Sequence, residues 1–238
     1  AVVALLLATS AADAALTTGK CLAQKQTAWG DLRKCQATEK AKVLKGKAAD
    51  LGKCQTKFQG KLTKIHSKGV IWIDCRYGNN GDGTVTDFDT GLQWEQKTTV
   101  VGSGVNFIDP HDVDNTYTWT AVVDGATPNG TAFTDFLPKL NGVSSDGVTI
   151  TGCFAGHCDW RLPTIVELRG IMTASTCLFF GNPCIDPIFG PTVADFYWSA
   201  TTNATVQDRS WLVGFDNGSV FSNPKYSGAA VRAVRGTC

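Results

Sequence analysis

Oxygen-bearing side chains along residues 80–89 have a spacing that could bind calcium. The oxygens of an EF-hand loop alternate toward Ca²⁺ in a similar way, and glycines permit its sharp bend. The pattern is incomplete, because Gly78 stands where the first Asp of such a loop belongs and the bidentate Glu is replaced. A plain β-turn leading into a hairpin is the alternative, and we expect no other cofactor. The four candidate ligands are Asp82, Thr84, Asp87 and Asp89.

The histidines of this chain do not belong to a recognisable catalytic motif. His66, His111 and His157 are scattered, and none has a Ser, Cys or carboxylate partner at the spacing of an activated nucleophile. Cys153, His157 and Cys158 have the side chains of zinc ligands, but no second Cys/His pair has suitable spacing. We therefore expect no catalytic residues and no enzymatic activity.

Aromatic residues in polar stretches are candidates for ligand contacts. Tryptophan and tyrosine rings stack on sugar rings while their polar atoms form hydrogen bonds. Tyr117, Trp119 and Tyr226 lie in polar, loop-like segments, so we expect them to face solvent and a ligand. The tryptophans expected in the core are Trp94, Trp160, Trp198 and Trp211.

The near-neutral net charge of +1 conceals two segments of opposite charge. Residues 20–68 hold 13 Lys/Arg against 3 Asp/Glu, a net of +10, whereas residues 69–238 hold 9 against 17, a net of −8. The basic segment could bind an anionic polymer or envelope surface, dock on the acidic domain, or only be solvated. The candidate ligand-binding lysines are Lys42, Lys45, Lys47 and Lys53.

This basic segment is rich in Ala, Lys, Gln and Leu and contains no proline, so we expect a helical hairpin that breaks near Gly46. Its apolar residues recur at steps of three and four and include cysteines. So few large apolar residues cannot stabilise a hairpin alone, and disulfides would contribute about 2–4 kcal/mol each.

The nine cysteines favour disulfides over metal ligation, because the chain is expected to be exported. The two firmest pairs each close a small loop, one on either side of a predicted helix. Of the other two pairs, one bridges the two helices of the hairpin and one joins the two ends of the large domain. Cys21 is left over, either free or paired between chains. The predicted pairs are Cys153–Cys158, Cys177–Cys184, Cys35–Cys54 and Cys75–Cys238.

Three segments follow from these shifts in composition. Residues 1–14 are apolar, end in an Ala-Asp-Ala cleavage pattern and are interpreted as a truncated signal peptide. Residues 15–68 form the basic hairpin, and residues 69–238 form a larger domain rich in Gly, Asn, Asp, Thr and aromatics. No segment is long and apolar enough to predict a membrane span.

Local signals predict the elements of the large domain. Thr164 can cap a helix, with Glu167 completing a capping box. Residues 210–222 read as a hairpin around an Asp-Asn-Gly turn, residues 83–94 as another, and residues 131–140 as helical. We expect an α+β fold with one twisted antiparallel sheet, two short helices and long loops.

Six blocks in this domain resemble the Lcl C-terminal domain family, named after a collagen-like bacterial surface adhesin. The resemblance covers about residues 73–236. The blocks are 80–87, 90–94, 160–168 with its Trp-Arg-Leu-Pro-Thr start, 197–199, 211–218 and 231–236.

The resemblance implies a secreted or surface-exposed bacterial protein, and the family's namesake binds sulfated polysaccharides. The Arg-Leu-Pro-Thr helix start is also similar to formylglycine-generating-enzyme and C-type-lectin-like domains, which implies a lectin-like scaffold. The calcium-dependent sugar motifs of C-type lectins are absent from the sequence. A scaffold does not by itself determine activity.

The resulting hypothesis is an adhesin-like, non-catalytic bacterial binding protein that recognises a polysaccharide. The alternative is a structural subunit of an extracellular homo-oligomer or filament, assembled between the basic hairpin of one copy and the acidic domain of another. Nucleic acid is not an expected partner, because the chain is expected to be exported and carries no recognised binding motif.

Overall fold

The structure is a computed structural model that describes residues 2–66, 76–142, 152–173 and 183–236. The chain divides into two compact units: Ala1–Gly78 with Asp87–Gly91, and Asn79–Thr86 with Leu92–Cys238. Within the described residues, no helix has the length and apolar character needed to cross a membrane.

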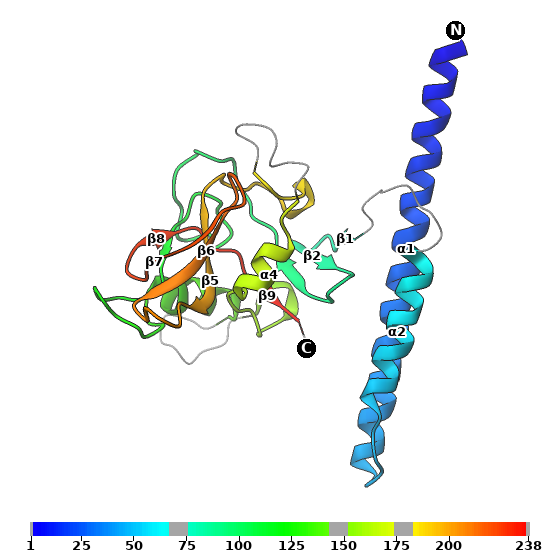
Figure 1. Ribbon diagram of the computed structural model, residues 1–238, viewed down its shortest axis with the longest axis horizontal. Helices are drawn as coiled ribbons and strands as arrows, with labels where there is room; N and C mark the ends of the chain where they lie inside the picture. Colours follow the sequence, from blue (N-terminus) through cyan, green and yellow to red (C-terminus); the bar gives the residue numbers. More distant parts are fainter. Residues whose placement is uncertain (1, 67–75, 143–151, 174–182, 237–238) are drawn as a thin grey trace. The chain divides into compact units, whose positions relative to one another are not determined.

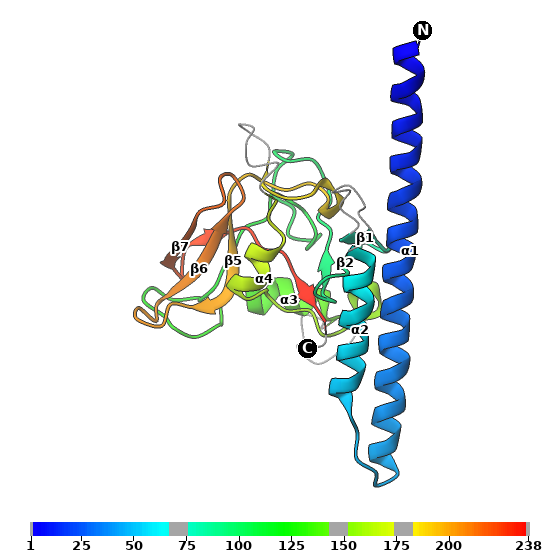
Figure 2. The same cartoon turned by 45° about the vertical axis from the view of Figure 1, so that its right-hand side comes forward.

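The first unit is a hairpin of two antiparallel helices, α1 (Val2–Leu44) and α2 (Leu51–His66) (Figures 1 and 2). The break near Gly46 is confirmed, because the connection between the helices spans residues 45–50. A disulfide joins Cys35 of α1 to Cys54 of α2, with their Cα atoms 5.7 Å apart. The small core around it contains Ala28, Leu32, Phe58 and Leu62, with the rings of Trp29 and Phe58 4.4 Å apart.

The second unit combines short helices with short antiparallel strands, so the α+β expectation is confirmed (Figure 1). The strands of the chain are β1 (Tyr77–Asn79), β2 (Thr84–Asp87), β3 (Gln93–Glu95), β4 (Tyr117–Thr118), β5 (Phe196–Thr202), β6 (Arg209–Gly214), β7 (Val220–Pro224), β8 (Gly228–Ala229) and β9 (Val234–Arg235). The helical segments of the second unit are the π-helix η1 (Ala132–Phe136), α3 (Leu137–Leu140), the 3₁₀ turns η2 (Phe154–Gly156) and η3 (Pro187–Phe189), and α4 (Ile165–Gly170).

Local sequence signals determine several of these elements. Thr164 caps α4: its side chain accepts a hydrogen bond from Glu167 N, and the Glu167 carboxylate accepts one from Thr164 N. The predicted capping box is therefore confirmed. The hairpin of β6 and β7 has Val213 opposite Val220 across the Asp-Asn-Gly turn, and β2 pairs with β3 in the same antiparallel manner.

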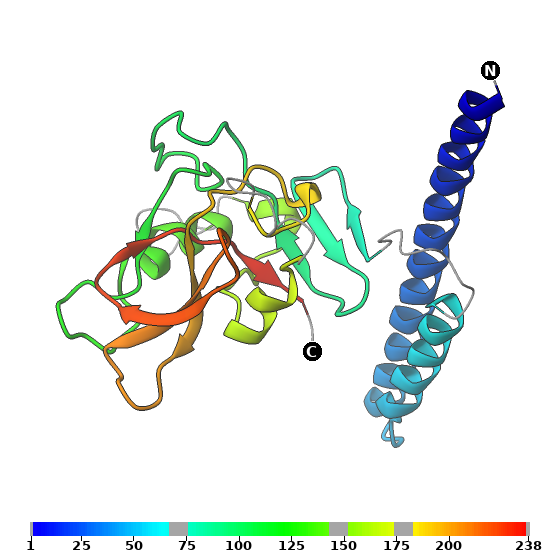
Figure 3. The same ribbon diagram turned by 45° about the horizontal axis from the view of Figure 1, so that its top comes forward.

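The expectation of one continuous sheet is wrong. Among the described residues the strands form three antiparallel sheets, ordered β1-β2-β3-β9, β4-β8 and β5-β6-β7. The C-terminal segment is the reason, because β8 pairs with β4 whereas β9 pairs with β3. Figure 3 shows this red segment passing from the orange strands to the turquoise ones. Pairing between segments more than 100 residues apart leaves no local pattern in the sequence.

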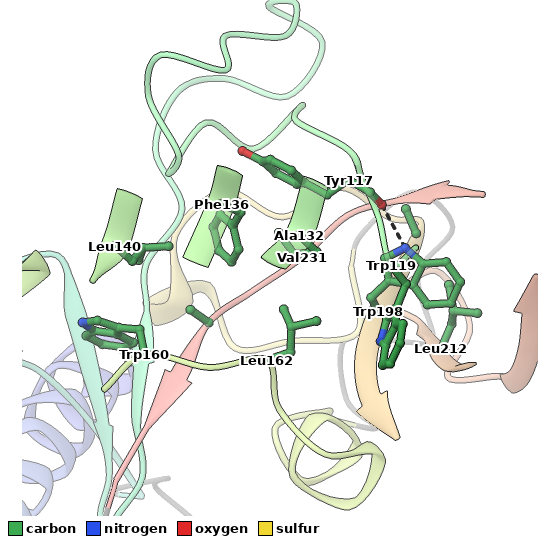
Figure 4. Close-up of a cluster of buried hydrophobic side chains, with 12 residues drawn as sticks. Tyr117, Trp119, Ala132, Phe136, Leu140, Trp160, Leu162, Trp198, Leu212 and Val231 are labelled. Atoms are coloured by element: carbon green, nitrogen blue, oxygen red, sulfur yellow. Dashed lines mark hydrogen bonds between the residues drawn. The ribbon is translucent and has the colours of Figure 1, made fainter. Parts of the chain in front are cut away.

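A hydrophobic cluster of the second unit is drawn in Figure 4. Trp198 on β5 and Trp160 are buried in it, together with Phe136 of η1 and Leu140 of α3. Trp198 Nε1 donates a 2.9 Å hydrogen bond to the carbonyl of Tyr117, which satisfies the indole inside the core. Of the other predicted core tryptophans, Trp94 is buried as expected, whereas Trp211 is only half-buried.

The described cysteines agree with the predicted pairs. Cys153 and Cys158 are joined, with their Cα atoms 5.1 Å apart, so the zinc alternative for this loop is wrong: both sulfurs are in a disulfide. Cys184 is disulfide-bonded. Its expected partner Cys177 lies outside the described residues, as do Cys75 and Cys238 and the side chain of Cys21.

Candidate functional site

The expectation that Tyr117 and Trp119 face solvent is wrong. Their side chains are 1% and 5% exposed and belong to the hydrophobic cluster. Trp119 Nε1 donates to the carbonyl of Ser199, and the Tyr117 ring packs 5.1 Å from that of Phe136. Burial of these large rings in a packed core outweighs the polar character of their neighbours in sequence.

Tyr226, the third aromatic candidate, is 44% exposed and contributes to an open surface depression of about 440 Å³. The depression lies where β4 and the segment after it meet the start of η1. Its lining is rich in hydroxyl and amide groups. The lining residues are Thr118, Thr120, Ala121, Val123, Asn129, Gly130, Thr131, Thr134 and Tyr226.

Hydrogen bonds fix the threonines of this depression. Thr118 and Thr131 are joined reciprocally, since each backbone N–H donates to the other's hydroxyl, at 2.9 and 3.1 Å. Thr134 Oγ1 donates to the Gly130 carbonyl. Because these hydroxyls have defined donors and acceptors inside the protein, their remaining lone pairs point in defined directions.

Asn129 lines the depression, and hydrogen bonds hold its side chain in place. Its Oδ1 accepts hydrogen bonds from Thr120 Oγ1 at 3.0 Å and from Ala121 N at 2.9 Å. Gly130 follows, and a Cβ atom there would lie 2.4 Å from the carbonyl oxygen of Thr118. The close approach of the two backbones at this point therefore requires glycine.

Lys225, next to Tyr226 in sequence, connects the segment of Trp119 and Thr120 to the C-terminal part of the domain. It is buried, its Nζ donates to the Ala126 carbonyl at 2.9 Å, and this atom lies 3.8 Å from the centroid of the Trp119 ring. Its own carbonyl accepts hydrogen bonds from the N–H groups of Trp119 and Thr120. Burial lowers the pKa of Lys225 below its ordinary value, and Asp208 opposes that shift.

Sequence reasoning missed the threonines, although the sequence carries a signal for them. In the run Tyr117-Thr118-Trp119-Thr120, alternation with a period of two places the aromatic residues on one face and the threonines on the other. This alternation predicts that Tyr117 and Trp119 face the core. Of the two threonines, Thr118 is half-buried, whereas Thr120 is buried with its hydroxyl bonded to Asn129.

The four candidate calcium ligands have protein partners. Asp82 Oδ1 accepts a hydrogen bond from the Thr84 hydroxyl, and Asp87 binds Arg76 through both carboxylate oxygens. Asp87 Oδ1 also accepts one from the backbone N–H of Asp89. These contacts brace the turn, and in the described part of the chain no three His, Cys, Asp or Glu side chains gather as a metal site.

The four candidate lysines belong to the helical unit rather than to the depression. Lys45, Lys47 and Lys53 are exposed, and Lys42 forms an ion pair with Glu39 at 2.6 Å. They lie at the end of α1, in the connection that follows it, and in the first turn of α2.

A buried ionic cluster, also missed from the sequence, lies in the second unit. Glu95 Oε1 is 2.9 Å from Lys97 Nζ and 2.8 Å from His111 Nδ1, and its Oε2 accepts a hydrogen bond from Ala233 N. Burial alone would raise the pKa of Glu95, but these three partners outweigh it and lower the pKa to about 2.

Arg232 extends this cluster toward the segment around η3. It is fully buried, and its NH1 donates 2.8 Å hydrogen bonds to the carbonyls of Glu95 and Phe189. NH2 donates to the hydroxyl of Thr192. The contacts tie β3, η3 and the C-terminal segment together, so the cluster serves to hold the fold.

The second unit is thus a small α+β domain with long connections and a depression lined by hydroxyl groups. A family model described as the Lcl C-terminal domain matches residues 83–235. The chain therefore belongs to the Lcl C-terminal domain family, and the resemblance noted in the sequence is confirmed. A search of curated proteins finds no match.

Proposed function

We propose that this chain is an adhesin-like binding protein, secreted or held at a bacterial cell surface, that recognises a polysaccharide without catalysis. Its binding site is the depression beside Tyr226. The observation that carries the proposal is an exposed aromatic ring beside a set of fixed hydroxyl and amide groups. A C-type-lectin-like scaffold, implied by the helix start at Thr164, is part of the same proposal.

The lining suits a sugar for two physical reasons. A pyranose presents hydroxyls that both donate and accept hydrogen bonds, and the lining suits both roles: the Asn129 side-chain amide can donate, and the Thr134 oxygen, whose hydrogen goes to Gly130, can accept. A sugar ring also has an apolar face, on which an exposed tyrosine ring can stack. An open depression rather than a closed cavity fits a polymer that extends beyond the site.

The composition of the lining supports binding rather than catalysis. The lining residues are threonine, alanine, valine, asparagine, glycine and tyrosine. None of these described residues supplies the carboxylate, imidazole or amine that acid–base chemistry on a glycoside uses. The disulfides are compatible with export to an oxidising compartment.

A glycan array probed with the full chain tests this proposal. The expected result is selective retention of one polysaccharide class, with a Tyr226→Ala variant losing that signal. Phe107→Ala is the matched control, since Phe107 is 45% exposed and does not line the depression. Absence of binding to any glycan, or equal loss in both variants, would contradict the proposal.

The opposite charges of residues 20–68 and 69–238 favour a second candidate, a homo-oligomer assembled between hairpin and domain. Light scattering on the same sample measures the mass in solution and tests this second candidate. Such an assembly has a mass well above 25.4 kDa that falls at high salt. A monomer mass at low salt would contradict assembly and leave the glycan proposal standing.

A further inference from the structure

The connection between α1 and α2 presents apolar side chains to solvent at the end of the helical hairpin. Leu44, the last residue of α1, is 90% exposed. Val43 before it and Leu51, the first residue of α2, are also exposed. We call residues 42–53 the hairpin tip. Leu44 and Leu51 do not belong to the small core of the hairpin, which lies around Phe58.

Backbone and side-chain hydrogen bonds hold this tip in one conformation. α1 ends in a Schellman motif: Gly46 has φ +69°, and the N–H groups of Gly46 and Lys47 donate to the carbonyls of Val43 and Lys42. The backbone of the tip is thus held in one conformation while Leu44 stays exposed to solvent.

The second half of the tip is braced in the same way. Asp50 caps α2, because its Oδ1 accepts a hydrogen bond from Lys53 N. Its own N–H donates to the carboxylate of the buried Glu39, which also binds Lys42. Lys42 and the backbone of Asp50 lower the pKa of Glu39 despite burial. The Cys35–Cys54 disulfide joins the helices behind the tip.

Lysines lie close in sequence to the exposed leucines, and Lys42 among them is paired with Glu39. Lys42, Lys45, Lys47 and Lys53 lie within the tip, and Asp50 is the one acidic residue among positions 42–53. Lysine carries a long aliphatic stem, so its ammonium group can reach anionic head groups while neighbouring side chains enter the apolar layer. A segment that carries exposed leucines among several lysines is therefore complementary to a bilayer with anionic lipids.

We propose that the hairpin tip inserts into the surface of an anionic lipid bilayer and attaches the protein there. An anionic polysaccharide would use the lysines but leave Leu44 in water, so the exposed leucine favours lipid as the partner. The inference does not rest on the depression beside Tyr226, which belongs to the other unit, and each can fail without the other.

Co-sedimentation of the full chain with vesicles tests the proposal. Vesicles of phosphatidylcholine with one third phosphatidylglycerol should bind the protein, and pure phosphatidylcholine vesicles should bind it much more weakly. Leu44→Ser should reduce the partition coefficient about tenfold. Ile108→Ser, which changes an equally exposed residue of the second unit, should leave it unchanged.

A charge-matched pair of variants completes the design. K45Q/K47Q should reduce binding about fivefold for each lysine removed. R33Q/K34Q should bind as wild type, because these residues lie roughly 15 Å along α1 from Leu44, beyond the Debye length of about 10 Å in 0.1 M salt. All four positions are exposed, and far-UV circular dichroism checks that the helices persist.

Two results would overturn the proposal. Failure of wild-type protein to bind phosphatidylglycerol vesicles contradicts it outright. Binding that K45Q/K47Q reduces but Leu44→Ser does not would show attraction by charge alone, and would assign the lysines to an anionic polymer instead of a bilayer.

Discussion

The ammonium group of Lys225 lies 3.8 Å from the centroid of the Trp119 ring, inside the domain rather than at its surface. The same residue accepts backbone hydrogen bonds from Trp119 and Thr120 and precedes Tyr226. Lys225 therefore holds the backbone of Thr120, a lining residue of the depression, and is adjacent to Tyr226, another lining residue. The position of Tyr226 depends on contacts between segments about 100 residues apart in sequence.

Replacing Lys225 tests whether its stem or its charge matters more. Lys225→Ala should lower the free energy of unfolding by about 2–3 kcal/mol, because it leaves a cavity against Trp119. Lys225→Met should cost less than about 1 kcal/mol, since it keeps the packing and removes a charge that is costly to bury. Urea denaturation measures both, and a Met variant less stable than the Ala variant would contradict this ordering.

The capping box of α4 makes a prediction at an exposed position. Thr164→Ala should destabilise the protein by about 1 kcal/mol, because the N–H of Glu167 loses its acceptor. Thr164→Ser keeps the hydroxyl and should retain wild-type stability. Thermal melting compares the two variants, and equal melting temperatures would show that the cap does not stabilise the domain.

Stability should depend on pH through Glu95. Its pKa falls from an ordinary 4.5 to about 2 in the folded state. The folded state therefore binds fewer protons, and the stabilising contribution is complete above pH 4.5 and lost as the pH falls toward 2. The shift corresponds to on the order of 3 kcal/mol at 1.36 kcal/mol per unit.

Comparison with Glu95→Gln isolates this contribution from those of other carboxylates. The difference in free energy of unfolding between wild type and Glu95→Gln should shrink between pH 4.5 and 2. A difference that stays constant over this range would contradict the ionic role of Glu95.

Features set by neighbouring residues could be predicted from the sequence. The Thr164 cap, the turn between β6 and β7 and the break near Gly46 all depend on contacts within a few residues. The family itself was evident because its sequence blocks are local. Such features require no knowledge of the tertiary fold.

Burial of polar and aromatic residues could not be predicted in the same way. Tyr117 and Trp119 are buried because Trp198, Ser199 and Lys225, which lie at least 80 residues away in sequence, pack on them. The burial of Glu95 likewise depends on Arg232 and Ala233. Sequence alone shows a charge or a ring but not the distant partner that makes its burial favourable.

The disulfide of the helical hairpin should be essential to its stability. A C35A/C54A variant should lower the free energy of unfolding of the helices by about 3 kcal/mol, the value expected for a closed loop of this length. C153A/C158A is the control, because this bond closes a loop in the second unit. Equal loss of the 222 nm signal in both variants on heating would contradict the prediction.

The most direct test of the proposed glycan site is a calorimetric titration of the best array ligand into wild type, Tyr226→Ala and Phe107→Ala. Loss of the stacking ring should weaken binding at least about tenfold in Tyr226→Ala, in line with about 1.4 kcal/mol per factor of ten. Phe107→Ala should bind as wild type. Unchanged affinity in Tyr226→Ala would contradict the assignment of the depression as the binding site.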